Sequence, residues 1–132
     1  MKVTVDTNIL VRAAVRDDAS QAQAAAKLLQ EAEVIAVSLP SLCEFVWVLR
    51  RLYRIETTDI ALALEALLAA GNVAVNRPAV DAGLAILKAG GDFADGLIAY
   101  EGAWLGADTF VSFDKQAVAL LRSQGHCARL LA

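Results

Sequence analysis

The 132-residue chain is predicted to be an α/β protein with three layers, α/β/α, around a central, mostly parallel sheet of four to five strands. Two observations predict this class. Short runs rich in β-branched residues alternate with longer stretches of helical periodicity. The short runs are apolar almost throughout, as expected when helices cover both faces of a parallel sheet. The length suits one domain, residues 1–132.

The first half of the chain alternates strands with helices. The predicted strands are residues 2–5, 34–38 and 73–76, and the predicted helices are 8–15, 20–31, 40–53 and 57–71. Ser20 is expected to cap the second helix, because a serine oxygen can accept hydrogen bonds from the first turn. Pro40 suits the first turn of the third helix, and Gly71 suits the end of the fourth.

The second half repeats the alternation. Helices are predicted at residues 78–89, 93–105 and 115–123, and strands at 109–113 and 127–131. Pro78 suits the start of the first of these helices, and the pair Gly90-Gly91 ends it. The last strand is expected at an edge of the sheet.

The composition limits the possible classes of protein. Hydrophobic residues make up 58% of the chain, more than a domain of this size usually hides, so we expect a partner interface. No apolar stretch is long enough to span a bilayer and no signal-peptide pattern opens the chain, which predicts a soluble cytoplasmic protein. Cys43 and Cys127 are expected to be buried thiols, and His126 a loop residue. No Ser/His/Asp set, phosphate-binding glycine loop or zinc pattern is present.

Two aspartates follow predicted strands. Asp6 ends the first strand within VTVDTNILV, and Asp114 ends the fourth within VSFDKQAV. In open parallel sheets, sites form beyond the carboxyl ends of the strands, so both residues fall where a site is expected. Each also has an ordinary explanation, because an aspartate at such a position turns the chain and caps the next helix.

Further acids lie in predicted helices. Glu44 is in the apolar segment SLCEFVWVL, where a charge is costly unless it is paired, hydrated or bound to a metal. We therefore favour a functional role for Glu44 over that of a surface glutamate. Asp92 and Asp95 lie three residues apart at the start of one helix. Asp92 is best explained as the cap of that helix, and Asp95 suits both its first turn and a site.

Together these acids predict a metal centre. Crowded carboxylates repel one another, so without a cation some of them would hold a proton. Hard oxygen ligands suit Mg²⁺ or Mn²⁺. Two such ions about 4 Å apart can activate a water molecule and stabilise the leaving oxygen of a phosphodiester.

The whole chain resembles the PIN-domain family, and within it the VapC-like ribonuclease toxins of bacterial toxin–antitoxin pairs. The resemblance rests on VDTNILV, the glutamate of the third helix, DFADGLIA and VSFD. The spaced acids of the family match, in order, Asp6, Glu44, Asp95 and Asp114. Asn8 matches the polar residue after the first acid, and Ser112 a hydroxyl position before the last. Gly96 replaces a common alanine, a difference that we expect to be minor.

The resemblance implies a PIN-like fold with a central parallel sheet, metal-dependent hydrolysis of RNA by water, and inhibition by a small antitoxin. The implied cofactor is Mg²⁺ or Mn²⁺. The expected roles are direct metal binding by Asp6 and Asp95, completion of the acidic pocket by Glu44 and Asp114, and hydrogen bonding to the carboxylates by Asn8 and Ser112.

The charge balance bears on RNA binding. A net charge of −3 argues weakly against it, but setting aside the four site acids leaves eleven acidic against twelve basic residues. The candidate phosphate contacts are Arg12, Arg50, Arg51 and Lys115. An equally good explanation for the arginines at the end of the third helix is that cations favour a helix C-terminus.

Two other functions stay open. One is a catalytically silent PIN-fold module that binds RNA or protein, which should neither take up metal nor cut RNA. The less favoured one is a magnesium-dependent phosphatase with Asp6 as nucleophile. Such enzymes have a second aspartate two residues on, where this chain has Asn8.

The surplus apolar surface predicts an antitoxin groove. One stripe of the helix at 41–53 is expected to be buried, and its members are Leu42, Phe45, Val46 and Leu49. Trp47 then lies on another side, and the next helix is also apolar beyond one stripe. We expect these two helices to bind an amphipathic antitoxin helix, with Trp47 as the anchor. The alternative is burial within the monomer or in a homodimer, which PIN proteins commonly form.

Overall fold

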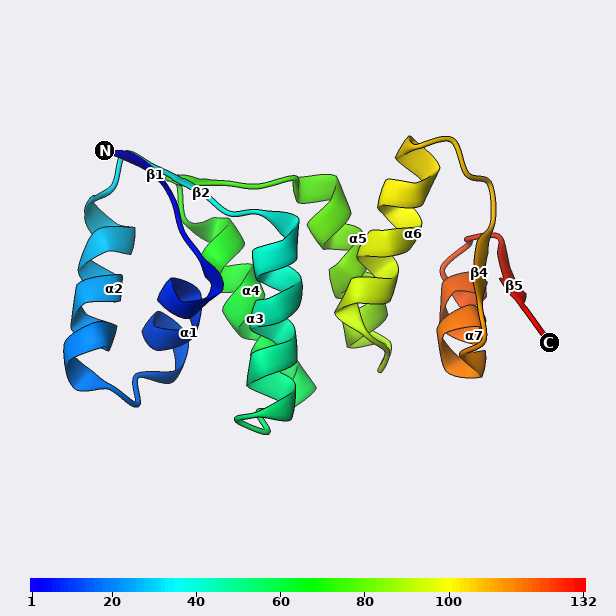
Figure 1. Cartoon of the computed structure of the whole chain (residues 1–132), viewed down its shortest axis with the longest axis horizontal. Helices are drawn as coiled ribbons and strands as arrows, with labels where there is room; N and C mark the ends of the chain where they lie inside the picture. The colour runs from blue at the N-terminus through cyan, green and yellow to red at the C-terminus, as the bar shows by residue number, and fades with distance from the viewer. The chain divides into compact units, whose positions relative to one another are not determined.

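The computed structural model describes all 132 residues and confirms the α/β class (Figure 1). The helices are α1 (Thr7–Val15), α2 (Ala19–Glu31), α3 (Leu39–Arg51), α4 (Thr57–Ala69), α5 (Arg77–Lys88), α6 (Phe93–Trp104) and α7 (Lys115–Ser123). The strands are β1 (Lys2–Thr4), β2 (Val34–Ala36), β3 (Val73–Ala74), β4 (Phe110–Ser112) and β5 (Ala128–Leu130). Every predicted element is present, and each strand is shorter than predicted. No helix combines the length and the apolar character that crossing a membrane requires.

All strand pairs are parallel, as predicted. The five strands are divided between a three-stranded sheet of order β1-β2-β3 and a two-stranded sheet β4-β5. Val3 is paired with Ile35, Ile35 with Val73, and Val111 with Arg129. A parallel pair needs a crossover, and here each crossover contains helices: α1 and α2, then α3 and α4, then α7.

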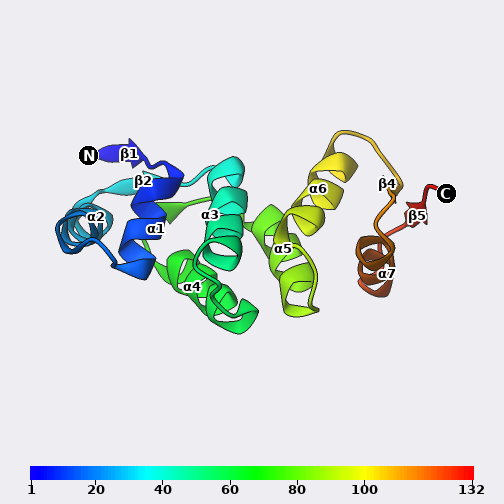
Figure 2. The ribbon, with the colours of Figure 1, turned by 60° about the horizontal axis from the view of Figure 1, so that its bottom comes forward.

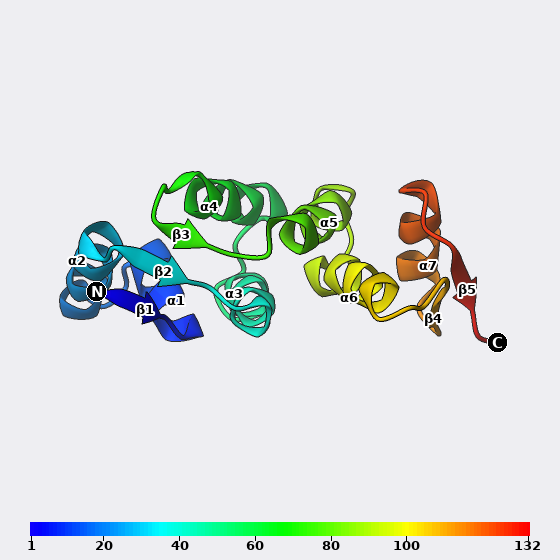
Figure 3. The same ribbon diagram turned by 90° about the horizontal axis from the view of Figure 1, so that it is seen from above.

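The chain forms two compact units, Met1–Asn76 and Arg77–Ala132, each described by itself. The first unit holds β1 to β3 with α1 to α4, and Figure 2 shows these helices around its sheet. The view from above in Figure 3 shows β1, β2 and β3 side by side in that order. In the second unit α5 lies against α6, and α7 lies against β4 and β5.

The core of the first unit includes the predicted face of α3. The buried residues of this helix are Leu42, Phe45, Val46 and Leu49, which confirms the predicted stripe. Ile35 of β2 and Ile60 and Leu64 of α4 are fully buried as well. Apolar burial of this kind stabilises the unit and fixes which side of α3 remains exposed.

The core of the second unit holds α7 against its sheet. Ile86, Val118, Leu121 and Ala128 form a buried cluster, with Phe110 packed against it. Phe93, the first residue of α6, is fully buried. This packing fixes the start of α6, where Asp92 and Asp95 lie.

One predicted helix cap is wrong. Asp18, not Ser20, caps α2, because its Oδ1 accepts a hydrogen bond of 3.0 Å from the backbone N–H of Gln21. Helix α2 therefore begins one residue before Ser20. Three of the four residues in DDAS have side chains that can cap a helix, and the backbone conformation of this connection determines which one does so. Cys127 is also exposed rather than buried, and Cys43 is half-buried.

Gly96 is not a minor departure from the family pattern. It is buried where α5 and α6 lie against each other. A Cβ atom there would overlap the backbone carbonyl group of Ala82 and lie 2.8 Å from the Cα of Gly83. The two helices are therefore in backbone contact at this point, which only a residue without a side chain permits.

We predict that Gly96→Ala lowers the free energy of unfolding by about 2 kcal/mol, because the backbone of α5 must move to admit the methyl group. Gly102→Ala is the matched control on the same helix, since a Cβ there meets nothing within 4 Å. That change should be neutral or stabilising by up to about 1 kcal/mol. Urea unfolding followed by circular dichroism measures both, and equal effects of the two changes would contradict the close approach.

Candidate functional site

Asp6 lies between the end of β1 and the start of α1 and caps this helix. Its Oδ1 accepts hydrogen bonds from the backbone N–H groups of Asn8 at 3.1 Å and Ile9 at 3.3 Å. The capping explanation is therefore confirmed, and the metal role stays a prediction. The side chain is exposed, and Oδ1 makes both of these bonds. Its Oδ2 remains available to a cation.

Asp6 lies at one wall of a groove between α1 and α2. The groove has a volume of about 510 Å³, and it is lined by Asp6, Asn8, Ile9, Arg12, Gln21, Ala24, Ala25 and Leu28. The lining therefore combines one carboxylate, one guanidinium and two side-chain amides with four apolar side chains. Asn8 contacts Asp6 through its backbone N–H, and its side chain is exposed.

Glu44 lies on the exposed side of α3, so one argument for its function is wrong. The helix is apolar towards the core, and Glu44 carries no burial penalty because water reaches it. Trp47, one helical turn further on, is exposed on the same helix, with 55% of its surface accessible. Glu44 and Trp47 thus offer one carboxylate and one aromatic ring on one exposed face.

In the second unit, Asp92 and Asp95 occupy the start of α6. Asp92 is the cap, because its Oδ1 accepts a hydrogen bond of 3.1 Å from the N–H of Ala94, which confirms its predicted role. Asp95 is in the first turn and is partly buried. Its backbone N–H donates to the carbonyl oxygen of Asp92 over 3.1 Å.

Asp114 repeats at β4 what Asp6 does at β1. It follows the strand and caps α7, because its Oδ1 accepts hydrogen bonds from the N–H groups of Gln116 at 2.9 Å and Ala117 at 3.1 Å. Ser112 contributes through its Oγ, which accepts a hydrogen bond of 3.0 Å from the backbone N–H of Asp114. Ser112 thus fixes the backbone that carries the carboxylate.

The carboxylates of the second unit influence one another. Burial raises the pKa of Asp95, and the negative charges of Asp92 and Asp114 raise it further. Ionised Asp95 therefore costs the folded state free energy above its raised pKa. The cost vanishes below the ordinary value of about 3.9, where folded and unfolded chains both hold the proton. A cation beside Asp95 would favour its ionised form.

The donor set suits a hard divalent cation. Every candidate ligand is a carboxylate, and carboxylate oxygens are the donors that Mg²⁺ and Mn²⁺ prefer. Within neither unit do three His, Cys, Asp or Glu side chains form a group that could hold a metal ion. Asp6 and Glu44 belong to the first unit, and Asp95 and Asp114 belong to the second.

The sequence profile of the PIN domain matches residues 3–120, which is most of the chain. The chain belongs to the PIN-domain family. PIN domains have a nuclease-type fold, are typically hydrolases, and generally depend on divalent metals. The match spans Asp6, Glu44, Asp95 and Asp114. Among curated proteins, none matches the chain significantly.

The basic residues of this PIN domain differ in their surroundings. Arg12 is half-exposed in the groove beside Asp6 and forms an ion pair of 2.9 Å with Asp17. Arg50, Arg51 and Lys115 are exposed, and Lys115 is the first residue of α7, next to Asp114. A phosphate contact of each stays a prediction. Arg12 lines a groove together with Asp6, a candidate metal ligand.

Sequence reasoning missed two residues around Arg12. Asp17 is five residues away, beyond a helix end, where no helical spacing rule pairs side chains. Tyr53 comes from the turn after α3, 41 residues from Arg12, so no local pattern indicates it. The spacing of an arginine and an aspartate across a tight helix–helix connection is the only signal that the sequence offers.

We predict that Asp92→Asn lowers the pKa of Asp95, because it removes one like charge while asparagine still caps α6. Carbon-detected NMR titration of the aspartate carboxyl groups measures the shift. Asp108→Asn is the control, since Asp108 lies in the same unit and is not among the charges that raise this pKa. An unchanged Asp95 titration in Asp92→Asn would show that the carboxylates do not interact.

Proposed function

We propose that this PIN-domain protein is a metal-dependent endoribonuclease, and that it acts in the cytoplasm as the toxin of a toxin–antitoxin pair. The observation that carries the proposal is the match to the PIN domain over residues 3–120, which spans Asp6, Glu44, Asp95 and Asp114. Burial and repulsion by the charges of Asp92 and Asp114 raise the pKa of Asp95, which agrees with a carboxylate that favours a cation beside it. A divalent cation removes this repulsion, and PIN domains generally use such ions.

The residues have separate roles in the proposal. Asp6 and Asp95 would hold Mg²⁺ or Mn²⁺, and Glu44 and Asp114 would orient water. The bound ion supplies Lewis acidity for an attacking water and charge stabilisation for the leaving oxygen. The backbone N–H groups that hold Oδ1 of Asp6 fix this carboxylate, which spares the site the cost of ordering it during the reaction. Ser112 does the same for the backbone of Asp114.

We predict that the protein cleaves single-stranded RNA with Mg²⁺ or Mn²⁺, and that chelation by EDTA abolishes cleavage. Asp6→Asn and Asp95→Asn should each lower kcat at least about 100-fold, since each removes a charged metal ligand worth several kcal/mol to the transition state. The readout is gel analysis of a labelled oligonucleotide together with metal binding by calorimetry.

Asp18→Asn is the matched control for these variants. Asp18 also caps a helix through Oδ1 and is not among the residues that line the groove of Asp6, so this change tests the loss of a capping carboxylate that has no proposed metal role. It should keep full activity. Cleavage that survives both EDTA and Asp6→Asn would contradict the metal mechanism. A protein that takes up no metal and cuts no RNA would instead be a silent binding module.

The proposed antitoxin contact uses the exposed face of α3. Its two prominent members are Glu44 and Trp47, and Trp47 offers a large apolar surface. An amphipathic antitoxin helix would cover Trp47 and extend an arginine or lysine towards Glu44 and Asp6, where a charge-assisted hydrogen bond would compete with the metal. A homodimer is the other expected partner, and the alternative is that it covers this face in place of the antitoxin.

We predict that Trp47→Ala weakens the complex with the antitoxin encoded by the neighbouring gene by about 2 kcal/mol, or roughly 30-fold. Co-purification and calorimetry measure binding, and circular dichroism monitors the fold. Trp104→Ala is the control, because Trp104 is 75% exposed and lies on α6 in the other unit. A well-folded Trp47→Ala protein with unchanged affinity would remove the main support for this surface.

A further inference from the structure

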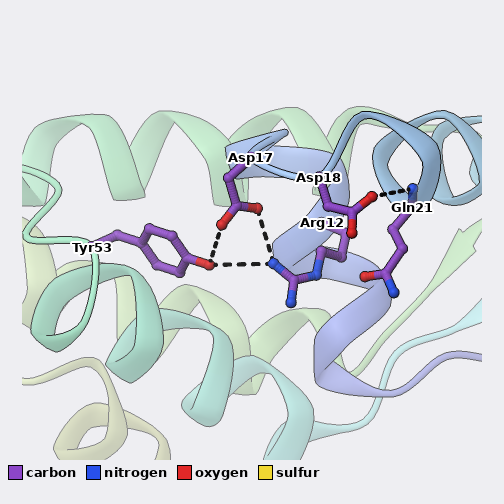
Figure 4. Close-up of polar contacts among 5 residues, drawn as sticks. All are labelled: Arg12, Asp17, Asp18, Gln21 and Tyr53. Carbon is purple, nitrogen blue, oxygen red and sulfur yellow. Dashed lines mark hydrogen bonds and ion pairs between the residues drawn. The ribbon is translucent and has the colours of Figure 1, made fainter.

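Arg12, Asp17 and Tyr53 form a closed cluster of polar contacts in the first unit (Figure 4). The Nη1 of Arg12 donates to Asp17 Oδ1 over 2.9 Å and to the hydroxyl of Tyr53 over 3.4 Å. The Tyr53 hydroxyl in turn donates to Asp17 Oδ2 over 2.9 Å. Each member therefore contacts the other two, and three separate parts of the unit meet here.

The chain is shaped to bring these groups together. Helix α1 ends at Val15, and its C-cap residue, Arg16, adopts a left-handed conformation with φ 60°. The N–H of Arg16 donates to the carbonyl oxygen of Arg12 over 3.1 Å. This turn directs Asp17 back towards Arg12. The next residue, Asp18, caps α2, as Figure 4 shows in its contact with Gln21. Tyr53 reaches the pair from the turn that follows α3.

The cluster uses only one side of the guanidinium. Both contacts of Arg12 are made by Nη1, so the edge formed by Nε and Nη2 has no hydrogen-bond acceptor within the chain. Asp17, by contrast, uses both of its oxygens. The hydrogen bond from Tyr53 lowers the pKa of Asp17, and Arg12 lowers it further, so Asp17 holds its charge at neutral pH. The Asp17 carboxylate thus accepts one hydrogen bond from the phenol of Tyr53 and one from the guanidinium of Arg12.

The same arginine lines the groove that holds Asp6. Arg12 is the only basic residue among the groove-lining side chains. Asp6 caps α1 and Arg12 lies within this helix six residues later, or about 9 Å further along the axis at 1.5 Å per residue. An RNA strand that followed the groove with one phosphodiester at Asp6 would bring a neighbouring part of its backbone to Arg12.

We propose that Arg12 binds a backbone phosphate adjacent to the scissile one through its Nε–Nη2 edge, and that Asp17 and Tyr53 are positioning residues that hold this edge towards the groove. The inference rests on the proposed RNA substrate. A guanidinium edge presents two parallel N–H groups, which match two phosphate oxygens. Because Asp17 and Tyr53 already hold the other side of the guanidinium, Arg12 loses less conformational entropy when RNA binds.

A simpler account is that the cluster only ties the α1–α2 connection to α3. The two accounts differ in how RNA binding responds to salt. Each phosphate neutralised by a cation contributes a fixed slope to the logarithm of affinity against the logarithm of salt concentration, about 0.7 for single strands. A purely structural ion pair contributes no such slope.

The test measures binding of a labelled single-stranded RNA by fluorescence anisotropy, in EDTA so that no cleavage occurs, across a range of KCl concentrations. Arg12→Gln should weaken binding about tenfold and reduce the salt slope by about 0.7. Arg12→Lys should retain the slope and still lose affinity, because an ammonium cannot form the paired contacts. Tyr53→Phe should retain the slope, weaken binding about threefold and raise KM without changing kcat.

Two matched controls accompany these variants. Lys27→Gln removes an equal charge from the exposed side of α2, outside the groove lining, and Tyr100→Phe removes a hydroxyl that accepts a hydrogen bond from Trp104 in the other unit. Both should bind RNA as the unmodified protein does. Thermal unfolding of every variant establishes that its fold is intact.

The outcomes separate the inference from the proposed function. If Arg12→Gln binds like Lys27→Gln, with the same slope, Arg12 contacts no phosphate. If Arg12→Gln loses affinity and Tyr53→Phe does not, the positioning role is wrong. If the protein binds RNA with the expected slopes and never cleaves it, the nuclease assignment fails and the phosphate contact stands. A protein that binds no RNA overturns both.

Discussion

The return of the chain from a strand into a helix is the constraint on which the rest of this structure depends. Parallel pairing of β1 with β2 and of β4 with β5 requires a helical crossover after the first strand of each pair. At both places an aspartate ends the strand region and caps the next helix with Oδ1. The geometry that makes the crossover thus also fixes two carboxylates, each with its second oxygen free to bind another group.

Charge in the two units is balanced in different ways. In the second unit, Asp95 lies near Asp92 and Asp114 with no cation among the causes that shift its pKa, so repulsion is left uncompensated there. In the first unit, the positive charge of Arg12 is paired with the carboxylate of Asp17, which also accepts a hydrogen bond from the hydroxyl of Tyr53.

Sequence patterns were sufficient for the class, the order of the elements and the buried stripe of α3, because hydrophobic periodicity directly encodes these features. Sequence patterns could not predict three features of the structure. The choice of Asp18 over Ser20 depends on loop geometry, and the contact of Tyr53 with Asp17 joins segments that share no local spacing. The exposure of Glu44 depends on which side of an apolar helix faces the core. Asp6, Asp95 and Asp114 were proposed as site acids from their positions at element ends, and Glu44 from its apolar segment, an argument that its exposure removes. The family resemblance supports all four.

Gly83 and Gly96, at the crossing of α5 and α6, link the separation of these helices to the position of a candidate metal ligand. A side-chain carbon at position 96 would meet the backbone of α5, and one at position 83 would meet the ring of Phe93. The present separation of the two helices therefore leaves no room for a methyl group at either position. Because Asp95 is the residue before Gly96, the position of this candidate ligand depends on how closely α6 packs against α5.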